Sequence, residues 1–146
     1  MSKDIIEDRI LVIDFGSQYT QLIARRVREI GVYCEIYHYK TSLSVIKKFN
    51  PQGIILSGGP ETVKQKGSPK VPDKLFDLGI PILGICYGMQ TIAKQLGGKV
   101  ELAEKREFGH ADLVLKNLAK GLFKGIKKKS INVWMSHGDH VSGLPK

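Results

Sequence analysis

The sequence predicts a doubly wound α/β domain with a mostly parallel sheet and a more antiparallel C-terminal third. Over the first two-thirds of the chain, short apolar runs that stop at glycine or polar turns alternate with segments of helical period. After Gly98, strand-like segments follow one another without long helices between them. Because βαβ crossovers are nearly always right-handed, the alternating part predicts a parallel sheet covered on both faces.

The first strand-helix pairs are predicted from the change of hydrophobic period. Residues 9–15 (RILVIDF) indicate a buried strand, and a helix is predicted from Ser17 onward. Gly31 stands where that helix would end in the left-handed conformation. Residues 32–39 are rich in strand-favouring side chains, and residues 42–49 predict a short amphipathic helix. The apolar stripe of the first helix is predicted to be Leu22, Ile23, Val27 and Ile30.

Two further strands are predicted on either side of a long polar loop. Residues 53–57 (GIILS) indicate a buried strand, followed by a loop with several glycines and prolines over residues 58–72. Residues 73–79 predict a brief helix, and residues 80–85 (IPILGI) predict a buried strand that ends at Cys86.

The helix after Cys86 is predicted to end at Gly97-Gly98, with an apolar stripe of Met89, Ile92, Ala93 and Leu96. Three strands are predicted beyond it, over residues 99–105, 111–116 and 130–136. The sequence contains no internal repeat or low-complexity tract. We therefore expect one domain over residues 1–146.

The composition is that of a soluble globular protein. With 146 residues, 42% apolar and 25% charged, the chain is long enough to bury a single core. The two cysteines imply no disulfide framework, and the N-terminus lacks an apolar leader. The longest apolar runs are far shorter than the roughly 20 residues that cross a bilayer. These observations predict a cytoplasmic protein with no membrane partner.

The net charge of +9 raises the question of an anionic partner. Much of the excess lies in residues 116–129 (KNLAKGLFKGIKKK), where the lysines are not interleaved with stackable aromatic side chains. No recognition motif accompanies them. The pattern favours a solvated or partner-facing surface and no nucleic-acid partner, and a basic nucleic-acid binder is the weaker alternative.

Cys86 has a glycine two places before it and another two places after it, where a strand turns into a helix. A cysteine that only fills a core needs no such glycines, so the pattern indicates a sharp turn around a reactive thiol. The positive end of the following helix is expected to favour the thiolate and make Cys86 more nucleophilic at neutral pH. The alternative is an inert buried cysteine.

Three segments are expected to meet at the carboxyl ends of the parallel strands, where open α/β sheets bind ligands: residues 14–18, 57–61 and 84–90. A carbonyl attacked by the Cys86 thiolate would develop an oxyanion, which backbone N–H groups stabilise. Gly58 or Gly59 could present one such group and Tyr87 another. The alternative is that these glycines only form a turn.

The four histidines leave the identity of a catalytic base open. His38 lies in a predicted strand and is interpreted as structural. Residues 110–112 (HAD) and 137–139 (HGD) each place a carboxylate two positions after a histidine. His140 adds a further ligand type to the second group, but no second ligand cluster accompanies it, so no metal site is predicted.

Taken together, these segments resemble the class I, triad-type glutamine amidotransferases, in the branch found in GMP synthases. The resemblance is carried in order and spacing by ILVIDFGSQYTQLIARRVRE (10–29), GIILSGGPETV (53–63), GICYGMQ (84–90), EFGHA (107–111) and WMSHGDHV (134–141). It covers nearly the whole chain. It implies the flavodoxin-like version of the doubly wound fold.

The resemblance also implies a reaction and roles for individual residues. Cys86 would attack the side-chain carboxamide of glutamine, form a glutamyl thioester and release ammonia, after which water frees glutamate. The backbone N–H groups of Gly59 and Tyr87 match the oxyanion-hole positions of the family. The positions that match the glutamine-binding residues are Gly58, Gln90, Ser136, His137, Gly138 and Asp139.

In the complete enzymes of this branch, ammonia passes to an ATP pyrophosphatase domain that converts XMP to GMP in purine nucleotide biosynthesis. The resemblance implies ATP and magnesium for that domain, no cofactor for the amidotransferase domain, and a homodimer for the complete enzyme. The partner domain would act in cis or in trans.

The sequence departs from the family in one respect that affects activity. The base and its orienting carboxylate form a His-x-Glu pair in the family, and no His-x-Glu occurs in residues 1–146. No SGGVDS-type phosphate loop occurs either. We therefore expect a C-terminally truncated domain with little or no activity alone. The rival hypothesis is a non-catalytic regulatory module of the same fold that binds glutamine or a partner.

Overall fold

The computed structural model describes residues 8–116 and 121–146, apart from the side chains of residues 105–107 and 137. The chain divides into two compact units, one formed by Leu102–Gly138 and the other by the rest of the chain. All four strands of the parallel sheet belong to the larger unit.

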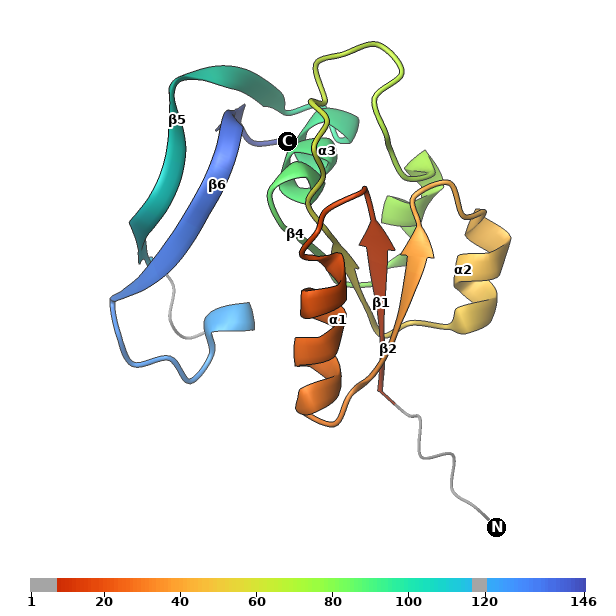
Figure 1. Ribbon diagram of the computed structural model, residues 1–146. Helices are drawn as coiled ribbons and strands as arrows, with labels where there is room; N and C mark the ends of the chain where they lie inside the picture. The colour runs from red at the N-terminus through yellow and green to blue at the C-terminus, as the bar shows by residue number, and fades with distance from the viewer. Residues whose placement is uncertain (1–7, 117–120) are drawn as a thin grey trace. The chain divides into compact units, whose positions relative to one another are not determined.

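The larger unit contains a four-stranded sheet of order β2-β1-β3-β4 (Figure 1). Every neighbouring pair in this sheet is parallel. This arrangement confirms the predicted doubly wound, flavodoxin-like sheet, and it places a switch in strand order between β1 and β3. The strands are β1 (Arg9–Asp14), β2 (Tyr33–His38), β3 (Gly53–Leu56) and β4 (Ile82–Gly84).

The helical segments of this unit follow the predicted order: α1 (Thr20–Glu29), α2 (Leu43–Phe49), the 3-10 helix η1 (Asp73–Leu78) and α3 (Tyr87–Gln95). Gly31 follows α1 with a φ of 83°, which confirms the predicted left-handed end of that helix. The first helix begins at Thr20 and not at Ser17, because the Ser17 hydroxyl accepts the Tyr19 N–H at 3.0 Å and holds a turn there.

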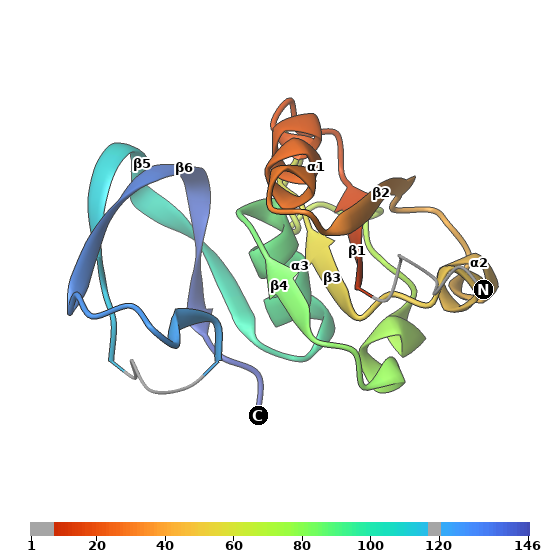
Figure 2. The ribbon, with the colours of Figure 1, turned by 90° about the horizontal axis from the view of Figure 1, so that it is seen from below.

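Side chains of β1 alternate between the two faces of the sheet, and helices cover both (Figure 2). On one face Val12 packs with Ala24 of α1 and with Cys34. The other face holds the larger cluster, in which Leu11 and Ile13 meet residues from α2, η1 and the start of α3. This cluster comprises Leu11, Ile13, Phe15, Ile46, Phe49, Ile54, Leu56, Val63, Val71, Leu75 and Tyr87.

The predicted apolar stripes of the helices are wrong in part. Leu22 of α1 and Ile30, which caps its C-terminus, are exposed. Met89 of α3 is 39% exposed, and Leu96, which caps the C-terminus of α3, is 45% exposed. The reason is that α3 packs through small and polar side chains, which bring the helix close to the sheet. The buried residues of α3 are Tyr87, Gly88, Gln90, Thr91 and Ala93.

The C-terminal third is antiparallel, as predicted, but its described residues contain two strands in place of the three that were expected. Residues 99–105 and 111–116 were expected as separate strands, but a single strand, β5 (Lys99–Val114), covers most of both. It pairs with β6 (Ser130–Gly143) in a two-stranded antiparallel sheet, and the short 3-10 helix η2 (Gly121–Phe123) lies between them. Gly109 lies inside β5 with a φ of 115°, a conformation open to glycine, and does not interrupt the strand.

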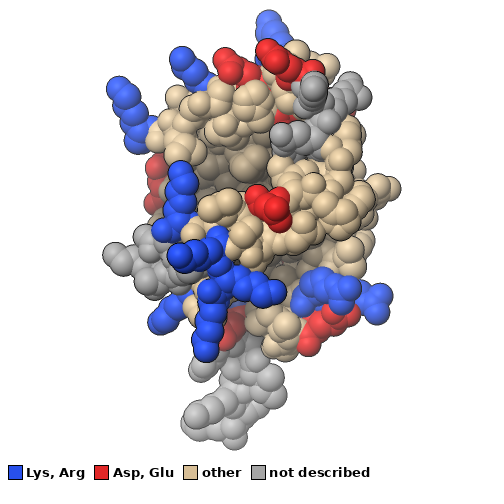
Figure 3. Space-filling view, turned by 90° about the vertical axis from the view of Figure 1, so that its left-hand side faces the viewer, with Lys and Arg blue, Asp and Glu red and all other residues tan. Residues whose placement is uncertain are grey.

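Lysine and arginine side chains outnumber acidic ones on the face shown in Figure 3. Of the lysines in the predicted basic segment, the described ones are exposed: Lys116, Lys124, Lys127, Lys128 and Lys129. Their exposure agrees with a solvated or partner-facing surface. In the part of the chain that the structure describes, no helix has the length and apolar character needed to span a membrane.

Candidate active site

Cys86 occupies the turn between β4 and α3 in a backbone conformation that side chains rarely adopt. It is the N-cap of α3, with φ 51° and ψ −113°. Its side chain is half-buried, whereas Cys34 is only 2% exposed. A non-glycine residue held at positive φ is a feature of functional turns, since the surrounding structure must maintain the strain.

The two flanking glycines allow the backbone around Cys86 to pack closely. A Cβ at Gly88 would lie 2.1 Å from the carbonyl oxygen of Leu56 in β3, and one at Gly84 would lie 2.6 Å from the Met89 nitrogen. Both distances are shorter than real Cβ contacts. The Gly88 N–H also donates to the Ser57 carbonyl at 3.0 Å. The glycines therefore seat the first turn of α3 directly on the end of β3.

The three predicted segments meet at this turn. A Cβ at Gly58 would lie 3.5 Å from the Cys86 Cβ and 3.6 Å from the Ser17 Oγ. Residues from the ends of β1, β3 and β4 are thus within contact range of one position. The prediction that segments 14–18, 57–61 and 84–90 converge is confirmed.

The backbone N–H groups of Gly59 and Tyr87 are relevant to the chemistry of Cys86, since they flank its turn in sequence or at the end of β3. Among the residues that the structure describes, neither the Gly59 N–H nor the Tyr87 N–H donates a hydrogen bond. Gly59 must be glycine here, because a Cβ would lie 2.5 Å from the carbonyl oxygen of Phe15. The Tyr87 side chain is anchored below the turn, where its hydroxyl donates to the Pro69 carbonyl and its ring centroid lies 5.1 Å from that of Phe15.

A buried polar network that the sequence analysis missed supports the loop after β3. The Thr20 hydroxyl lies 3.0 Å from Asp14 Oδ1 and 3.0 Å from Ser57 Oγ. The Ser57 hydroxyl donates to the Gly58 carbonyl at 3.2 Å. A small hydroxyl residue at a strand end, directly before two glycines, was the available signal for this role.

Gln90 and Asp139 lie together in the larger unit, both buried. The Gln90 side chain donates from Nε2 to the Asp139 carbonyl at 3.1 Å. The Asp139 carboxylate accepts the Thr62 hydroxyl at 2.6 Å, a contact that the sequence did not reveal. Gln90 and Asp139 are thus joined by a hydrogen bond, and their predicted role in binding glutamine remains a prediction.

The remaining residues of the predicted glutamine site, Ser136 to Gly138, lie on β6 in the smaller unit. Ser136 is exposed and Gly138 is half-buried. The side chain of His137 lies outside the described residues. The roles predicted for these three residues remain predictions.

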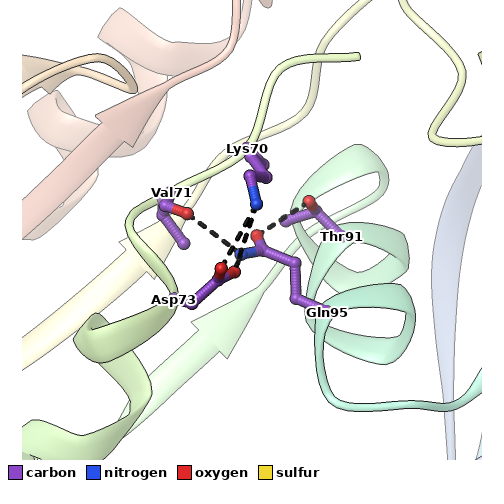
Figure 4. Close-up of polar contacts among 5 residues, drawn as sticks. All are labelled: Lys70, Val71, Asp73, Thr91 and Gln95. Carbon is purple, nitrogen blue, oxygen red and sulfur yellow. Dashed lines mark hydrogen bonds and ion pairs between the residues drawn. The ribbon is translucent and has the colours of Figure 1, made fainter. Parts of the chain in front are cut away.

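The loop after β3 is fastened to α3 at its far end (Figure 4). Gln95 donates from Nε2 to the Val71 carbonyl at 2.9 Å and to Asp73 Oδ1 at 2.7 Å. This hydrogen bond, together with that from Lys70, lowers the pKa of the Asp73 carboxyl. Lys94 of α3 also donates to the Val63 carbonyl. The loop that carries Gly58 and Gly59 is therefore held on the helix that follows Cys86.

Two of the described histidine side chains, His38 and His110, have partners that fit structural roles. The His38 Nδ1 accepts the Lys40 N–H at 3.2 Å, which agrees with the structural interpretation of this residue. His110 lies 2.9 Å from Asn132 Oδ1 and not against Asp112, and its ring packs edge-on to Trp134. His140 is exposed. Within the described ranges, no group of three or more metal-ligating side chains is found.

The predicted lowering of the thiol pKa at the helix N-terminus is wrong. Burial raises the pKa of the Cys86 thiol, because desolvation disfavours the thiolate. No described cationic side chain forms an ion pair or hydrogen bond with Cys86 that would offset this effect. The thiol is therefore mostly protonated at neutral pH and needs a base before it can attack a carbonyl.

Alkylation by iodoacetamide is expected to report this raised pKa. The rate at Cys86 should keep rising with pH beyond 9.0, the ordinary value, because only the thiolate reacts. Mass spectrometry of tryptic peptides would measure the rate, and the more deeply buried Cys34 should react more slowly still. A plateau near neutral pH would show instead that the helix N-terminus prevails over burial.

Comparison with known proteins agrees with this geometry. The model of the family "Glutamine amidotransferase class-I" matches residues 11–146. The chain belongs to this family.

The most similar curated relatives of this amidotransferase chain include two GMP synthases described as glutamine-hydrolysing. The protein of Hahella chejuensis is 56% identical over 100% of this chain, and that of Aeromonas salmonicida is 53% identical over 99%. The chain spans 29% of the length of each relative.

Solved structures show the same fold. A putative GMP synthase subunit from Thermoplasma acidophilum has a TM-score of 0.78 at 32% identity, covering 95% of this chain and 69% of that one. A glutamine amidotransferase of Methylobacillus flagellatus has a TM-score of 0.64 at 13% identity, covering 96% and 58%, and this likeness shows the fold alone.

Proposed function

We propose that this amidotransferase chain carries the thioester-forming part of a glutaminase that supplies ammonia to a GMP synthase. The proposal is supported by the contact-range approach of Gly58 to Cys86, together with two neighbouring backbone N–H groups that have no acceptor among the described residues, those of Gly59 and Tyr87. The similarity to glutamine-hydrolysing GMP synthases over the full chain supports the substrate and the destination of the ammonia.

In the proposed reaction, the Cys86 thiolate attacks the side-chain carbonyl carbon of glutamine and a C–S bond forms. The carbonyl oxygen becomes an oxyanion that accepts hydrogen bonds from Gly59 and Tyr87. The C–N bond then breaks, the nitrogen takes a proton and leaves as ammonia, and a glutamyl thioester remains. Water cleaves the thioester to glutamate and regenerates the thiol. Gly58, Gln90 and the 136–139 segment would hold the substrate.

The proposal includes the partner and the limits of this chain. An ATP pyrophosphatase domain, in cis or in trans, would use the ammonia with ATP and magnesium to convert XMP to GMP. Because the sequence has no His-x-Glu pair and burial raises the pKa of Cys86, the nucleophile has no assigned base. The chain alone is therefore proposed to bind glutamine and to turn it over very slowly.

The diazo-ketone analogue of glutamine tests the proposal without needing turnover. The Cys86 sulfur bonds to the diazo carbon, that carbon takes the thiol proton, and dinitrogen leaves. Mass spectrometry should show one adduct on Cys86, formed at a rate that saturates with analogue concentration and falls when glutamine is added. Cys34→Ser should label normally and Cys86→Ser not at all. Labelling that neither saturates nor responds to glutamine would contradict a glutamine site and leave a partner-binding module of the same fold.

A further inference from the structure

We propose that Ser57, held by Thr20, is a positioning residue that aims the Gly59 N–H at the oxyanion of the acylation step. This inference rests on the proposed function, since it assigns a role within the same site. Ser57 is fully buried and Thr20 nearly so, and among the described residues neither forms a hydrogen bond with Cys86. They would act only through the peptide that joins Gly58 to Gly59.

The geometry of the Gly58–Gly59 peptide couples its two polar groups. A trans peptide is planar, and its C=O and N–H groups point in opposite directions. The Gly58 carbonyl and the Gly59 N–H belong to the same plane. A group that fixes the carbonyl oxygen therefore also fixes the direction of the N–H.

A peptide between two glycines needs such a group. Neither residue has a Cβ to restrict its backbone, so the peptide could rotate at low energetic cost and turn its N–H away from the site. The Ser57 hydroxyl prevents this by donating to the Gly58 carbonyl at 3.2 Å. Gly58 itself lies beside the Cys86 turn, since a Cβ built on it would be 3.5 Å from the Cys86 Cβ.

The surrounding network positions the hydroxyl oxygen of Ser57. The Phe15 N–H donates to Ser57 Oγ at 3.4 Å, and Thr20 Oγ1 lies 3.0 Å from the same atom. These two contacts hold Ser57 Oγ at 3.2 Å from the Gly58 carbonyl oxygen that it donates to. Asp14, which accepts from the Gly16 N–H at 2.8 Å and lies 3.0 Å from the Thr20 hydroxyl, keeps Thr20 in place.

The test compares two reactions of Cys86, of which only one forms an oxyanion. The γ-p-nitrophenyl ester of glutamate acylates the thiolate: a C–S bond forms, the C–O bond breaks, and p-nitrophenolate leaves without needing a proton. Iodoacetamide alkylates the same thiolate at a saturated carbon, so its rate reports only the availability of the thiolate. At alkaline pH both reactions proceed without a catalytic base.

Thr20→Val and Ser57→Ala are expected to slow the p-nitrophenolate burst roughly 10- to 100-fold, less than the loss of a whole donor from an oxyanion hole. Their alkylation rates should stay within about twofold of the parent chain. Thr20→Ser keeps the hydroxyl and should restore the burst. Thr91→Val is the matched control, because it removes a buried hydroxyl that lies 3.3 Å from Gln95 Oε1, away from the Ser57 network.

The outcomes separate the inference from the proposed function. An unchanged burst in folded Thr20→Val would overturn the positioning role, as would equal losses of acylation and alkylation. If Ser57→Ala fails to fold, the Thr20 pair still decides the question. If the parent chain shows no burst that depends on Cys86, the proposed function itself fails.

Discussion

Replacing Gly88 with alanine is expected to destabilise the fold more than any other single methyl addition at the active-site turn. The added Cβ would lie 2.1 Å from the carbonyl oxygen of Leu56, a backbone atom that cannot rotate away. Alanine favours a helix over glycine by about 1 kcal/mol, so the clash must exceed this gain for the variant to be destabilised. Overpacking of this kind costs about 3 kcal/mol or more in the free energy of unfolding.

Urea denaturation followed by circular dichroism would measure the effect. Gly97→Ala is the matched control, since Gly97 ends the same helix with a φ of 88° and has no atom within 4 Å of an added Cβ. Only the left-handed strain applies there, at a cost of roughly 1 kcal/mol. Equal losses in the two variants would show that α3 shifts to accommodate the methyl group and that its close seating on β3 is not essential.

Glutamine turnover by the purified chain is expected to be about equal to that of its Cys86→Ser variant. The thiol is protonated at neutral pH because burial raises its pKa, and no histidine with a described side chain hydrogen-bonds to it. Loss of the base in a catalytic triad costs roughly 10⁴-fold or more in rate. A coupled assay for released ammonia would measure the turnover.

The glutamine-hydrolysing GMP synthase of Hahella chejuensis provides the positive control for this assay. Ammonia release that depends on Cys86 and approaches the rate of that relative would contradict the missing-base account. His110→Ala and His140→Ala would then identify whether either histidine supplies the base. The labelling experiment with the diazo-ketone analogue remains informative in both cases, because it does not require turnover.

The parallel sheet could be predicted from sequence because buried strands such as residues 9–15 and 53–57 are apolar on both faces and end at glycines. The convergence of segments at the Cys86 turn followed from the rule that carboxyl ends of parallel strands share one edge. The predicted apolar stripe of α3 was wrong in part because the helix approaches the sheet through Gly88 and Ala93. The Met89 side chain is therefore exposed.

Other features of the site depend on three-dimensional contacts that no local pattern encodes. The hydrogen bond between Thr62 and Asp139 joins residues far apart in the chain. The direction of the Cys86 pKa shift depends on whether burial, which raises the pKa, outweighs the helix N-terminus, which lowers it. The spacing of residues in the sequence gives the relative size of neither effect. Gly109 made the sequence of β5 resemble two separate strands, since a glycine can stand inside a strand as well as between two strands.

The left-handed backbone at Cys86 has a consequence for laboratory evolution of this protein. A side chain in that conformation costs of order 1–3 kcal/mol, which glycine would not incur. Cys86→Gly should therefore raise the free energy of unfolding and at the same time remove the nucleophilic thiol. Selection for heat resistance or high expression alone would tend to discard the sulfur, so any such campaign must screen for reactivity in parallel.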